Sequence, residues 1–468
     1  MQIGLSFLFF LSIMTLAGYF AVKKSSASTD DYLLAGRNVS AIPMALSALA
    51  SKISGFMFIG MLGYIYKVGF SSIWFLVAWI FSDWVIWRFF YAKIREKSET
   101  ENITTVTAFA ASCIKPRDDS NHRNTYFLKV LAVIVIIFMG VYAAAQLSAG
   151  AKALESVLSI SYNLNVIMAA VLIAAYCFAG GIRASIWTDT VQAVLMFLSM
   201  IFLAFVAVFK CGGIQNLFNS LGAIDLNLVH WIPDDLSFGF VIFLLGRIAN
   251  GFALLGQPHI VVRAMLIKDL KSFRVAELTY FIYYIVFCIA LFFVALAARV
   301  ILPDLINSDP ELALLSLSNE LLPQILIGLI LAGVFSSTIS TADSQILSCT
   351  AGISQDLFPS IKDKYWTNKI ITLGILLFTT ILALMSNESV FSLTMFGWVS
   401  LGVVFAPLIL LKIIDIKLES KIIIISSLLS LIISLFWGAS PWHHSVNEVL
   451  IGFVTFLIFS FSLNKIFK

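Results

Sequence analysis

The feature that most constrains this chain is a series of apolar segments, each about as long as a membrane-spanning helix. A bilayer core about 30 Å thick needs about 20 apolar residues per helix. Of the 468 residues, 60% are hydrophobic and only 12% are charged, about half the charge of a soluble domain. We therefore expect an all-α polytopic membrane protein with about thirteen transmembrane helices, at about 3–22, 41–66, 70–92, 125–151, 160–180, 186–209, 237–256, 275–301, 322–352, 368–386, 389–411, 421–438 and 447–465.

The connections between these segments are too short for a separate catalytic module, the longest being about 93–124 and 210–236. They contain no phosphate-binding glycine loop, kinase signature or nucleophile elbow, so the sequence supports neither an enzyme nor ATP-driven transport. The net charge of +4 is small for the length, and no nucleic-acid partner is expected. Five scattered cysteines indicate neither a disulfide framework nor a metal site.

The basic residues predict how the chain is oriented. With the N-terminus outside, 23 Lys and Arg fall in inside connections or ends and only 4 fall outside. Basic residues concentrate on the cytoplasmic side of membrane proteins. The sequence therefore predicts a multi-pass protein of the cell (inner) membrane with an outside N-terminus and a cytoplasmic C-terminus. The shortest connection in this arrangement is 387–388.

Two of the expected spans contain small and polar residues that a plain anchor would not keep. The second span contains Ala50-Ser51-Lys52-Ile53-Ser54-Gly55 and the seventh contains Gly246-Arg247-Ile248-Ala249-Asn250-Gly251. Interrupted helices at corresponding positions of two halves are typical of the substrate site of a transporter. Glycine-packed helix contacts are the alternative interpretation.

These interruptions suggest two five-helix repeats of opposite topology within one transmembrane domain, 1–468. Its predicted parts are an extra helix at 3–22, repeat one at about 41–209, repeat two at about 237–411 and C-terminal helices at about 421–465.

The ninth span has a face of hydroxyl groups. Ser337, Ser340, Thr341 and Ser344 follow the i, i+3, i+4, i+7 spacing of one helix face, and Asp343 lies among them. Sodium is a hard cation and prefers oxygen ligands, so this face is a candidate sodium site opposite the interrupted second span. The alternative is that these hydroxyls join helices or bond back to their own backbone. A mid-span carboxylate favours the functional interpretation.

Polar residues in two further spans are open to both interpretations. Asp189 either caps a helix N-terminus or binds a cation on the inner release path. Tyr142 and Gln146, at i and i+4, either line a cavity or bond across helices.

At these residues the sequence resembles the sodium/solute symporter family, and most closely its sodium/proline symporter branch. The resemblance is carried by Trp187-Thr188-Asp189-Thr190-Val191-Gln192 after Gly180-Gly181, by Gly256-Gln257-Pro258-His259-Ile260 followed by Arg263, and by Ser340-Thr341 followed by Gln345 and Asp356-Leu357. It extends from the first span to about residue 411. It implies a fold of the leucine-transporter type, with inverted five-helix repeats, one extra helix before them and two after.

The resemblance also implies three sets of site residues. The principal sodium ligands would be the main-chain carbonyls of Ala50, Ile53 and Ser337 and the hydroxyls of Ser340 and Thr341. A second cation position, present in some members, would use Asp189, Ser340, Asp343 and Ser344. The solute pocket would be formed by Ser54, Gly55, Phe56, Tyr142, Asn250 and Leu254, with Gln257 and Pro258 just beyond, and by Gln146 if it lines the cavity.

The chain departs from the pattern of the proline branch at several pocket positions. Lys52 replaces an aspartate, the pocket tryptophans and a tyrosine are missing, and Arg247 is an additional cation. The Lys52 ammonium could take the place of a coupling cation, pair with Asp343, or hold a substrate carboxylate together with Arg247.

The sequence thus predicts a monomeric secondary transporter that imports a small organic solute, proline or a related amino acid being the best candidate, by sodium-coupled alternating access. Proton-coupled or ion-independent transport of an anionic or other small solute is the alternative, because of Lys52. A sensor with the transporter fold is a remote alternative, since the tail after residue 465 is too short for a signalling domain. A channel is not expected, because it would need a continuous polar pore, whereas the polar positions of the spans cluster around one point near the middle of the membrane.

Overall fold

The computed structural model describes residues 2–22, 28–115, 121–233, 236–386 and 389–466. These residues form α-helices joined by short 3-10 and π segments, with no strand among them. The helices are α1 (Gln2–Val22), α2 (Thr29–Leu34), α3 (Ala41–Lys52), α4 (Leu62–Val68), α5 (Ile73–Ile86), α6 (Ala92–Thr100), α7 (Val106–Ala111), α8 (Asn121–Leu158), α9 (Tyr162–Lys210), α10 (Ile214–Ile224), α11 (Gly239–Phe252), α12 (Pro258–Leu266), α13 (Phe273–Ile301), α14 (Ala313–Leu321), α15 (Gln324–Ala351), α16 (Tyr365–Met385), α17 (Val390–Ile413), α18 (Ser420–Gly438) and α19 (Glu448–Ile466).

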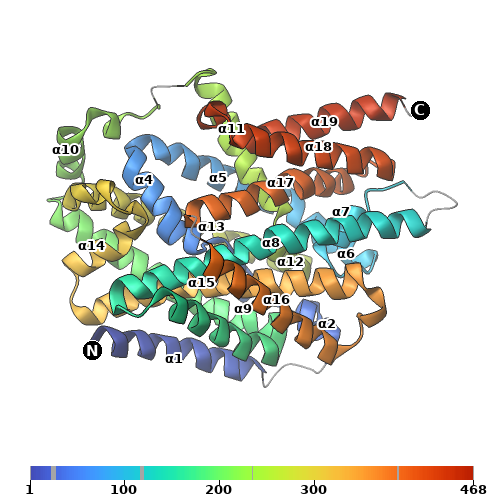
Figure 1. The fold of residues 1–468 in the computed structure, drawn as a ribbon, viewed down its shortest axis with the longest axis horizontal. Helices are drawn as coiled ribbons and strands as arrows, with labels where there is room; N and C mark the ends of the chain where they lie inside the picture. The colour runs from blue at the N-terminus through green and yellow to red at the C-terminus, as the bar shows by residue number, and fades with distance from the viewer. Residues whose placement is uncertain (1, 23–27, 116–120, 234–235, 387–388, 467–468) are drawn as a thin grey trace.

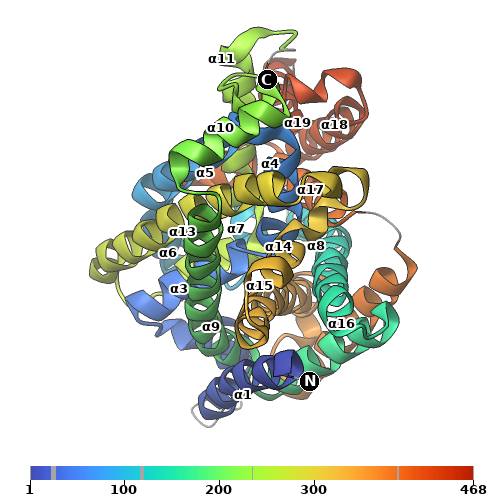
Figure 2. The same cartoon turned by 90° about the vertical axis from the view of Figure 1, so that its left-hand side faces the viewer.

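Most of the long helices run along the longest axis of the molecule (Figure 1). The short helices gather at the two ends of this axis, α10 and α14 at one end and α2, α6 and α7 at the other. In the view turned by 90°, α1 lies at one edge of the bundle and α18 and α19 lie at the opposite edge (Figure 2). In the interior, α15 packs against α8 and α9, and α3 packs against α9 and α13.

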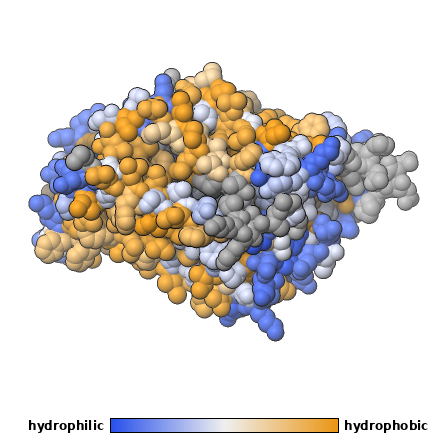
Figure 3. All heavy atoms as spheres, turned by 90° about the horizontal axis from the view of Figure 1, so that it is seen from below, coloured by the Kyte–Doolittle hydropathy of each residue, from blue (hydrophilic) through white to orange (hydrophobic). Residues whose placement is uncertain are grey.

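The outer surface of this bundle suits a lipid environment. Eleven helices in the described part of the chain are long and apolar enough to cross a membrane. Large side chains such as Phe205 and Phe209 on α9 are 72% and 78% exposed. Apolar residues cover much of the middle of the molecule, and hydrophilic residues collect toward its ends (Figure 3). Such a surface would be unstable in water, and the expectation of an all-α polytopic membrane protein is confirmed.

The thirteen expected spans are not all separate helices in the structure. Residues 56–100 form a run of helical segments that covers parts of two expected spans and is interrupted at Gly69, where φ is +77° and ψ is −143°. The expected spans 160–180 and 186–209 both lie in α9, which is interrupted at Gly181. Gly181 has φ +55°, and a Cβ there would lie 2.4 Å from the carbonyl oxygen of Tyr32, so only glycine fits. The count of thirteen stays a prediction, and the connection at 387–388 lies outside the described residues.

The first expected helix interruption is present. The helix α3 ends at Lys52, and Ile53 leaves helical geometry with φ −76° and ψ 69°. The backbone resumes as a π segment, Phe56–Met61, and continues into α4. The polar sequence between residues 50 and 55 therefore marks a real break in a buried helix.

The second interruption lies after the predicted segment, Gly246–Gly251, and not within it. The helix α11 continues through Gly246 and Gly251 to Phe252 and is followed by a 3-10 segment, Ala253–Gly256. A Cβ on Gly246 would lie 2.8 Å from the backbone nitrogen of Asn447, and one on Gly251 would lie 2.5 Å from Ser82 Oγ. These two glycines thus allow close helix packing, the alternative interpretation. The break occurs before Pro258, which begins α12, because proline disfavours helical geometry in the preceding residue.

Candidate cation and solute sites

The broken end of α3 presents backbone oxygens to the hydroxyl face of α15. The last backbone bond of this helix is donated by the Ile53 amide to the Leu49 carbonyl at 2.6 Å. The carbonyls that follow have no helical amide to accept from. The Ala50 carbonyl accepts from Ser340 Oγ at 2.8 Å, and the Ser51 carbonyl accepts from Thr341 Oγ1 at 3.1 Å. Two side chains predicted to bind sodium therefore meet the predicted carbonyl segment.

The third main-chain oxygen of this predicted site comes from α15 itself. The Ser337 carbonyl accepts from Thr341 Oγ1 at 3.0 Å and from Ser340 Oγ at 3.4 Å. The Ser337 hydroxyl donates to the Val334 carbonyl at 2.6 Å and takes no part. The Ala50 and Ser337 carbonyls and the two hydroxyls therefore form a cluster of oxygens at the negative end of α3, beside the buried Ile53. This oxygen set fits a hard monovalent cation.

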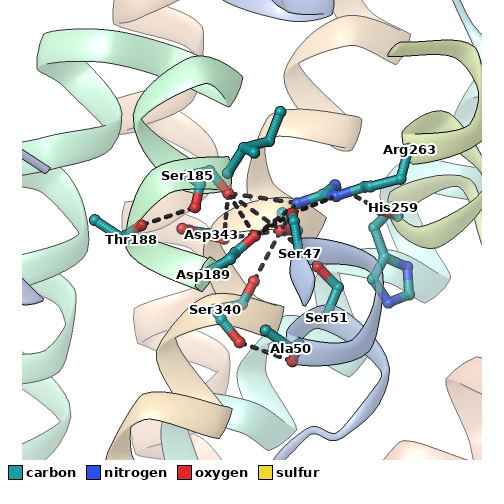
Figure 4. A network of polar contacts seen from close by, with 12 residues as sticks. Ser47, Ala50, Ser51, Ser185, Thr188, Asp189, His259, Arg263, Ser340 and Asp343 are labelled. Atoms are coloured by element: carbon teal, nitrogen blue, oxygen red, sulfur yellow. Dashed lines mark hydrogen bonds and ion pairs between the residues drawn. The ribbon is translucent and has the colours of Figure 1, made fainter. Parts of the chain in front are cut away.

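The residues of the predicted second cation position also meet, but an arginine lies among them (Figure 4). Arg263 Nη2 lies 2.5 Å from Ser344 Oγ and 3.3 Å from Asp189 Oδ2. Arg263 Nε donates to Ser47 Oγ at 3.2 Å, and Ser47 Oγ donates to Asp189 Oδ2 at 2.6 Å. We call Arg263, Asp189, Asp343, Ser47, Ser185 and Ser344 the arginine cluster. It connects α3, α9, α12 and α15.

The remaining carboxylate of the arginine cluster is held by hydroxyl groups. Asp343 Oδ1 accepts from Ser344 Oγ at 2.9 Å and from Ser185 Oγ at 3.2 Å. The Asp189 side chain therefore does not serve only as a helix cap, because its carboxylate lies inside the protein and forms an ion pair. A small cavity of about 30 Å³ reaches Ser344 from the side of α7 and α12. This cavity is large enough to hold a water molecule.

Arg263, Ser47 and Ser185 were not predicted as site residues. Arg263 belongs to a motif that carried the family resemblance, but its spacing gave it no partner. Its position one turn into α12 points its side chain at α9, where Asp189 lies. The partners of Arg263 depend on how the helices pack against one another, and the sequence alone does not give this packing.

On the other side of the α3 break, Lys52 forms an ion pair with Asp83 of α5. This contact rules out one of the three interpretations of Lys52, its pairing with Asp343. Tyr280 donates to Asp83 Oδ2 at 2.5 Å, and the Lys52 ammonium lies 4.3 Å from the Tyr284 ring centre and 5.2 Å from that of Trp79. We call Lys52, Asp83, Trp79, Tyr280 and Tyr284 the lysine cluster.

The lysine cluster is buried throughout. Lys52 is 4% exposed and Asp83 is fully buried. Asp83 was not predicted as a site residue, although a carboxylate inside an expected span is itself a signal. Because the Lys52 ammonium pairs with Asp83 of α5, it points toward α5 and not toward the oxygens contributed by α15.

The predicted solute-pocket residues gather around the same break. The Gly55 amide donates to Gln146 Oε1 at 2.9 Å, so Gln146 bonds across helices. A Cβ on Gly55 would lie 2.6 Å from Thr338 Cγ2. The absence of a side chain at Gly55 therefore allows the broken segment to approach α15 closely. The ring of Tyr142 lies 5.7 Å from the ring of His259.

Asn250 organises a group of aromatic rings beside this segment. Its Oδ1 accepts from Trp79 Nε1 at 2.9 Å, and its carbonyl accepts from Trp398 Nε1 at 3.1 Å. The two indoles stack at 5.1 Å, and the ring of Phe56 lies 6.0 Å from Trp79. The pocket region therefore contains two tryptophans, at positions other than those at which the tryptophans of the proline branch are missing. They come from α5 and α17, helices that a position-by-position comparison did not include.

Leu254 and Gln257 complete the predicted set at the second break. Both are fully buried, and Gln257 Nε2 donates to the Trp398 carbonyl at 2.9 Å. Several polar atoms here have no hydrogen-bond partner within the described structure: Gln146 Nε2, Gln257 Oε1 and both ring nitrogens of His259. Buried polar atoms are normally paired, so these atoms are available to a bound polar molecule.

Arg247 lies elsewhere than predicted. Its guanidinium stands over the rings of Phe243 and Phe75, at 4.8 and 5.1 Å. It lines a cavity of about 600 Å³ together with residues of the segments around 309–311, 389–399 and 434–448. We call this cavity the vestibule. Arg247 and Lys52 thus contact different groups, and the structure does not bring them together as a carboxylate clamp.

The aromatic side chains of Tyr64 and Phe391 separate the vestibule from the pocket region. Phe391 lies 5.3 Å from Phe56 and 5.8 Å from Tyr64, and Tyr64 and Phe391 both line the vestibule. Glu311, from the segment before α14, accepts from the Phe391 amide at 3.0 Å and from Lys152 Nζ at 3.3 Å.

Comparison with known proteins identifies what this chain is similar to. Residues 32–429 match the model of the sodium:solute symporter family. The sodium/proline symporter of Escherichia coli (strain K12) is 26% identical over 457 residues, covering 94% of this chain and 88% of that protein. The high-affinity proline transporter PutP of Bacillus subtilis (strain 168) is 24% identical over 456 residues, covering 95% of this chain and 94% of that protein.

Two solved structures share the fold. A Na+-coupled sialic acid symporter, described as revealing a novel Na+ site, superposes with a TM-score of 0.82 at 17% identity, covering 100% of this chain and 98% of that one. Mhp1, a nucleobase-cation-symport-1 family transporter, superposes with a TM-score of 0.61 at 14% identity, covering 92% of both chains. The predicted fold of the leucine-transporter type is confirmed.

Proposed function

Because this chain belongs to the sodium:solute symporter family, and is therefore a transporter and not an enzyme, we propose that it imports L-proline or a closely related amino acid together with sodium. The relatives named above are proline transporters. Import proceeds by alternating access, with solute and sodium bound near the middle of the membrane at the two helix breaks.

The observation that carries this proposal is the contact between the broken end of α3 and the hydroxyl face of α15. Ser340 and Thr341 lie within hydrogen-bond distance of carbonyls that have lost their helical amides. Sodium binds here by replacing hydroxyl-to-carbonyl hydrogen bonds with metal–oxygen contacts. Its ligands are the carbonyls of Ala50, Ile53 and Ser337 and the hydroxyls of Ser340 and Thr341. The ion then holds α3 against α15.

The solute binds beside this ion, between the broken segment and α8, α11 and α17. The amide of Gln146 has a free donor, Nε2, suited to a carboxylate, and Gln257 has a free acceptor, Oε1, suited to an ammonium group. The rings of Phe56, Trp79 and Trp398 supply an apolar wall for a pyrrolidine ring. Sodium and solute each hold the same broken segment, so each raises the affinity for the other by the same factor.

The proposal includes the predicted arrangement in the membrane. The N-terminus lies outside and the C-terminus in the cytoplasm of a cell with this protein in its inner membrane, and one chain forms the transport unit. Repeats at about 41–209 and 237–411 rock against each other, with residues 3–22 and 421–465 as flanking helices. The vestibule of about 600 Å³, against about 30 Å³ on the side of α7, corresponds to a state that faces outward.

The test is uptake of labelled L-proline into proteoliposomes, with sodium and proton gradients imposed separately. We expect an inward sodium gradient to drive accumulation and a proton gradient without sodium to have no effect. Accumulation driven by protons alone, or equilibration without any ion gradient, would contradict sodium coupling and favour the alternative raised by Lys52. Counterflow of labelled proline distinguishes a transporter from a sensor, since a sensor does not exchange its ligand across the membrane.

A further inference from the structure

The arginine cluster contains the oxygen atoms that the resemblance assigned to a second cation, and a guanidinium already contacts them. Arg263 Nη2 lies 2.5 Å from Ser344 Oγ, 3.3 Å from Asp189 Oδ2 and 3.4 Å from Ser185 Oγ. Three oxygens from two different helices thus face one nitrogen. A serine hydroxyl has only one proton and two lone pairs, so Ser344 has little capacity left for another cation.

The guanidinium is held in place from several directions. Arg263 Nη1 donates to the His259 carbonyl at 2.6 Å within α12, and Nε donates to Ser47 Oγ on α3 at 3.2 Å. Arg263 is 1% exposed and Asp189 is fully buried. A buried arginine cannot lose its charge and presents its donors in a rigid plane. Its positive charge is therefore a permanent part of the cluster.

A metal ion and this guanidinium compete for the same place. A sodium ion close enough to bind both Ser344 Oγ and Asp189 Oδ2 would stand against Arg263 Nη2, with two positive charges in contact in a poorly solvated interior. The other carboxylate, Asp343, is stabilised by donated hydrogen bonds from Ser185 and Ser344. The principal site differs, because the cluster formed by Ala50, Ser337, Ser340 and Thr341 contains only oxygens.

We infer that Arg263 serves as a tethered cation that takes the second cation position, so that this chain binds and transports a single sodium ion per solute. The inference rests on the proposed sodium coupling and adds the stoichiometry. It also gives Arg263 a positioning role: its guanidinium connects α12 of the second repeat to α3, α9 and α15 without an ion that must be released in each cycle.

The direct test counts sodium ions on the intact protein without needing the solute. Equilibrium binding of radioactive sodium to the purified chain in detergent is expected to saturate at one ion per chain. Saturation at two ions would overturn the inference while leaving sodium coupling intact. Absence of saturable binding would overturn both the inference and the proposed function. The two failures are thus distinguishable.

Removal of the tethered cation should open the second position. The variant Arg263→Gln is expected to bind two sodium ions per chain, whereas Arg263→Lys, which keeps a charge, is expected to bind one. Arg183→Gln is the matched control, since Arg183 pairs with Asp31 outside the cluster. It is expected to bind one ion. A single ion bound by folded Arg263→Gln would contradict the competition. If Arg263→Gln does not fold, the double variant Asp189→Asn/Arg263→Gln takes its place, because it removes both charges of the ion pair. The number of sodium ions bound per wild-type chain still decides the inference.

Discussion

Two buried ion clusters flank the proposed sodium site, and they are built differently. The lysine cluster has one cation and one carboxylate, Lys52 and Asp83, enclosed by aromatic rings. The arginine cluster has one cation and two carboxylates, surrounded by serine hydroxyls and bordered by a small cavity at Ser344. The first is balanced in formal charge and sealed, whereas the second resembles the coordination shell of an ion.

This difference separates a structural role from a functional one. The lysine cluster joins α3 to α5 and α13 and has few oxygens to offer to an added ion. The arginine cluster uses oxygens from three helices, and its guanidinium occupies a position that an ion could also take. We therefore expect removal of the two cations to have different consequences, although both are buried and both are paired.

The largest effect is expected for Lys52→Met, which leaves the Asp83 carboxylate buried without its cation. Breaking a buried ion pair by removing one partner costs about 3–5 kcal/mol in free energy of unfolding. Thermal unfolding of the purified protein should show a large fall in the midpoint. The double variant Lys52→Met/Asp83→Asn should recover most of it, because the unpaired charge is gone. A normal midpoint with lost uptake in Lys52→Met would instead give Lys52 a role in binding solute or replacing an ion.

The variant Arg263→Gln should also lower the midpoint, but sodium should restore part of the loss. An ion at 100 times its dissociation constant stabilises the folded state by about 2.7 kcal/mol. The comparison is made between sodium chloride and choline chloride at equal ionic strength. Lys52→Met is the control and should show no such additional recovery. Equal sodium responses of the two variants would remove the distinction between the clusters.

Between the clusters, Ser340→Ala and Thr341→Ala should each raise the sodium concentration for half-maximal proline uptake roughly tenfold, or about 1.4 kcal/mol. Each variant removes one ligand oxygen from the principal site. Ser336→Ala is the matched control, because its hydroxyl contacts Met14 Sδ on α1. An unchanged sodium dependence in both site variants would place the principal ion elsewhere.

An effect of similar size, on the solute and not on sodium, is expected for Asn250→Ala, which touches neither cluster's ion pair. Its side chain holds Trp79, and losing a buried hydrogen bond costs about 1–3 kcal/mol. At saturating sodium, the proline concentration for half-maximal uptake should rise by about one order of magnitude. Asn216→Ala on the exposed α10 should behave like the wild type. An unchanged proline affinity in Asn250→Ala would exclude the aromatic group from the solute pocket.

The sequence predicted those features that depend on local order along one helix. The hydroxyl face of α15 follows from the spacing of Ser337, Ser340, Thr341 and Ser344, and the break after Lys52 follows from small and polar residues in an apolar run. The second break was misplaced, because Gly246 and Gly251 permit close packing while helical geometry continues.

The partners of the buried cations could not be obtained from the sequence in the same way. Lys52 meets Asp83 and Arg263 meets Asp189 only because helices distant in sequence are packed together. The tryptophans near Asn250 show the same limit, since they come from α5 and α17. Spacing along one helix carries no information about which face of another helix it meets.

The central claim is that sodium and solute are coupled through the broken end of α3, and reciprocal binding tests it most directly. The dissociation constant of L-proline is measured with and without sodium, and that of sodium with and without L-proline, on the purified chain. We predict that each ligand strengthens the binding of the other by the same factor, and that this factor falls toward one in Ser340→Ala. L-proline binding that is independent of sodium in the wild-type chain would contradict the account.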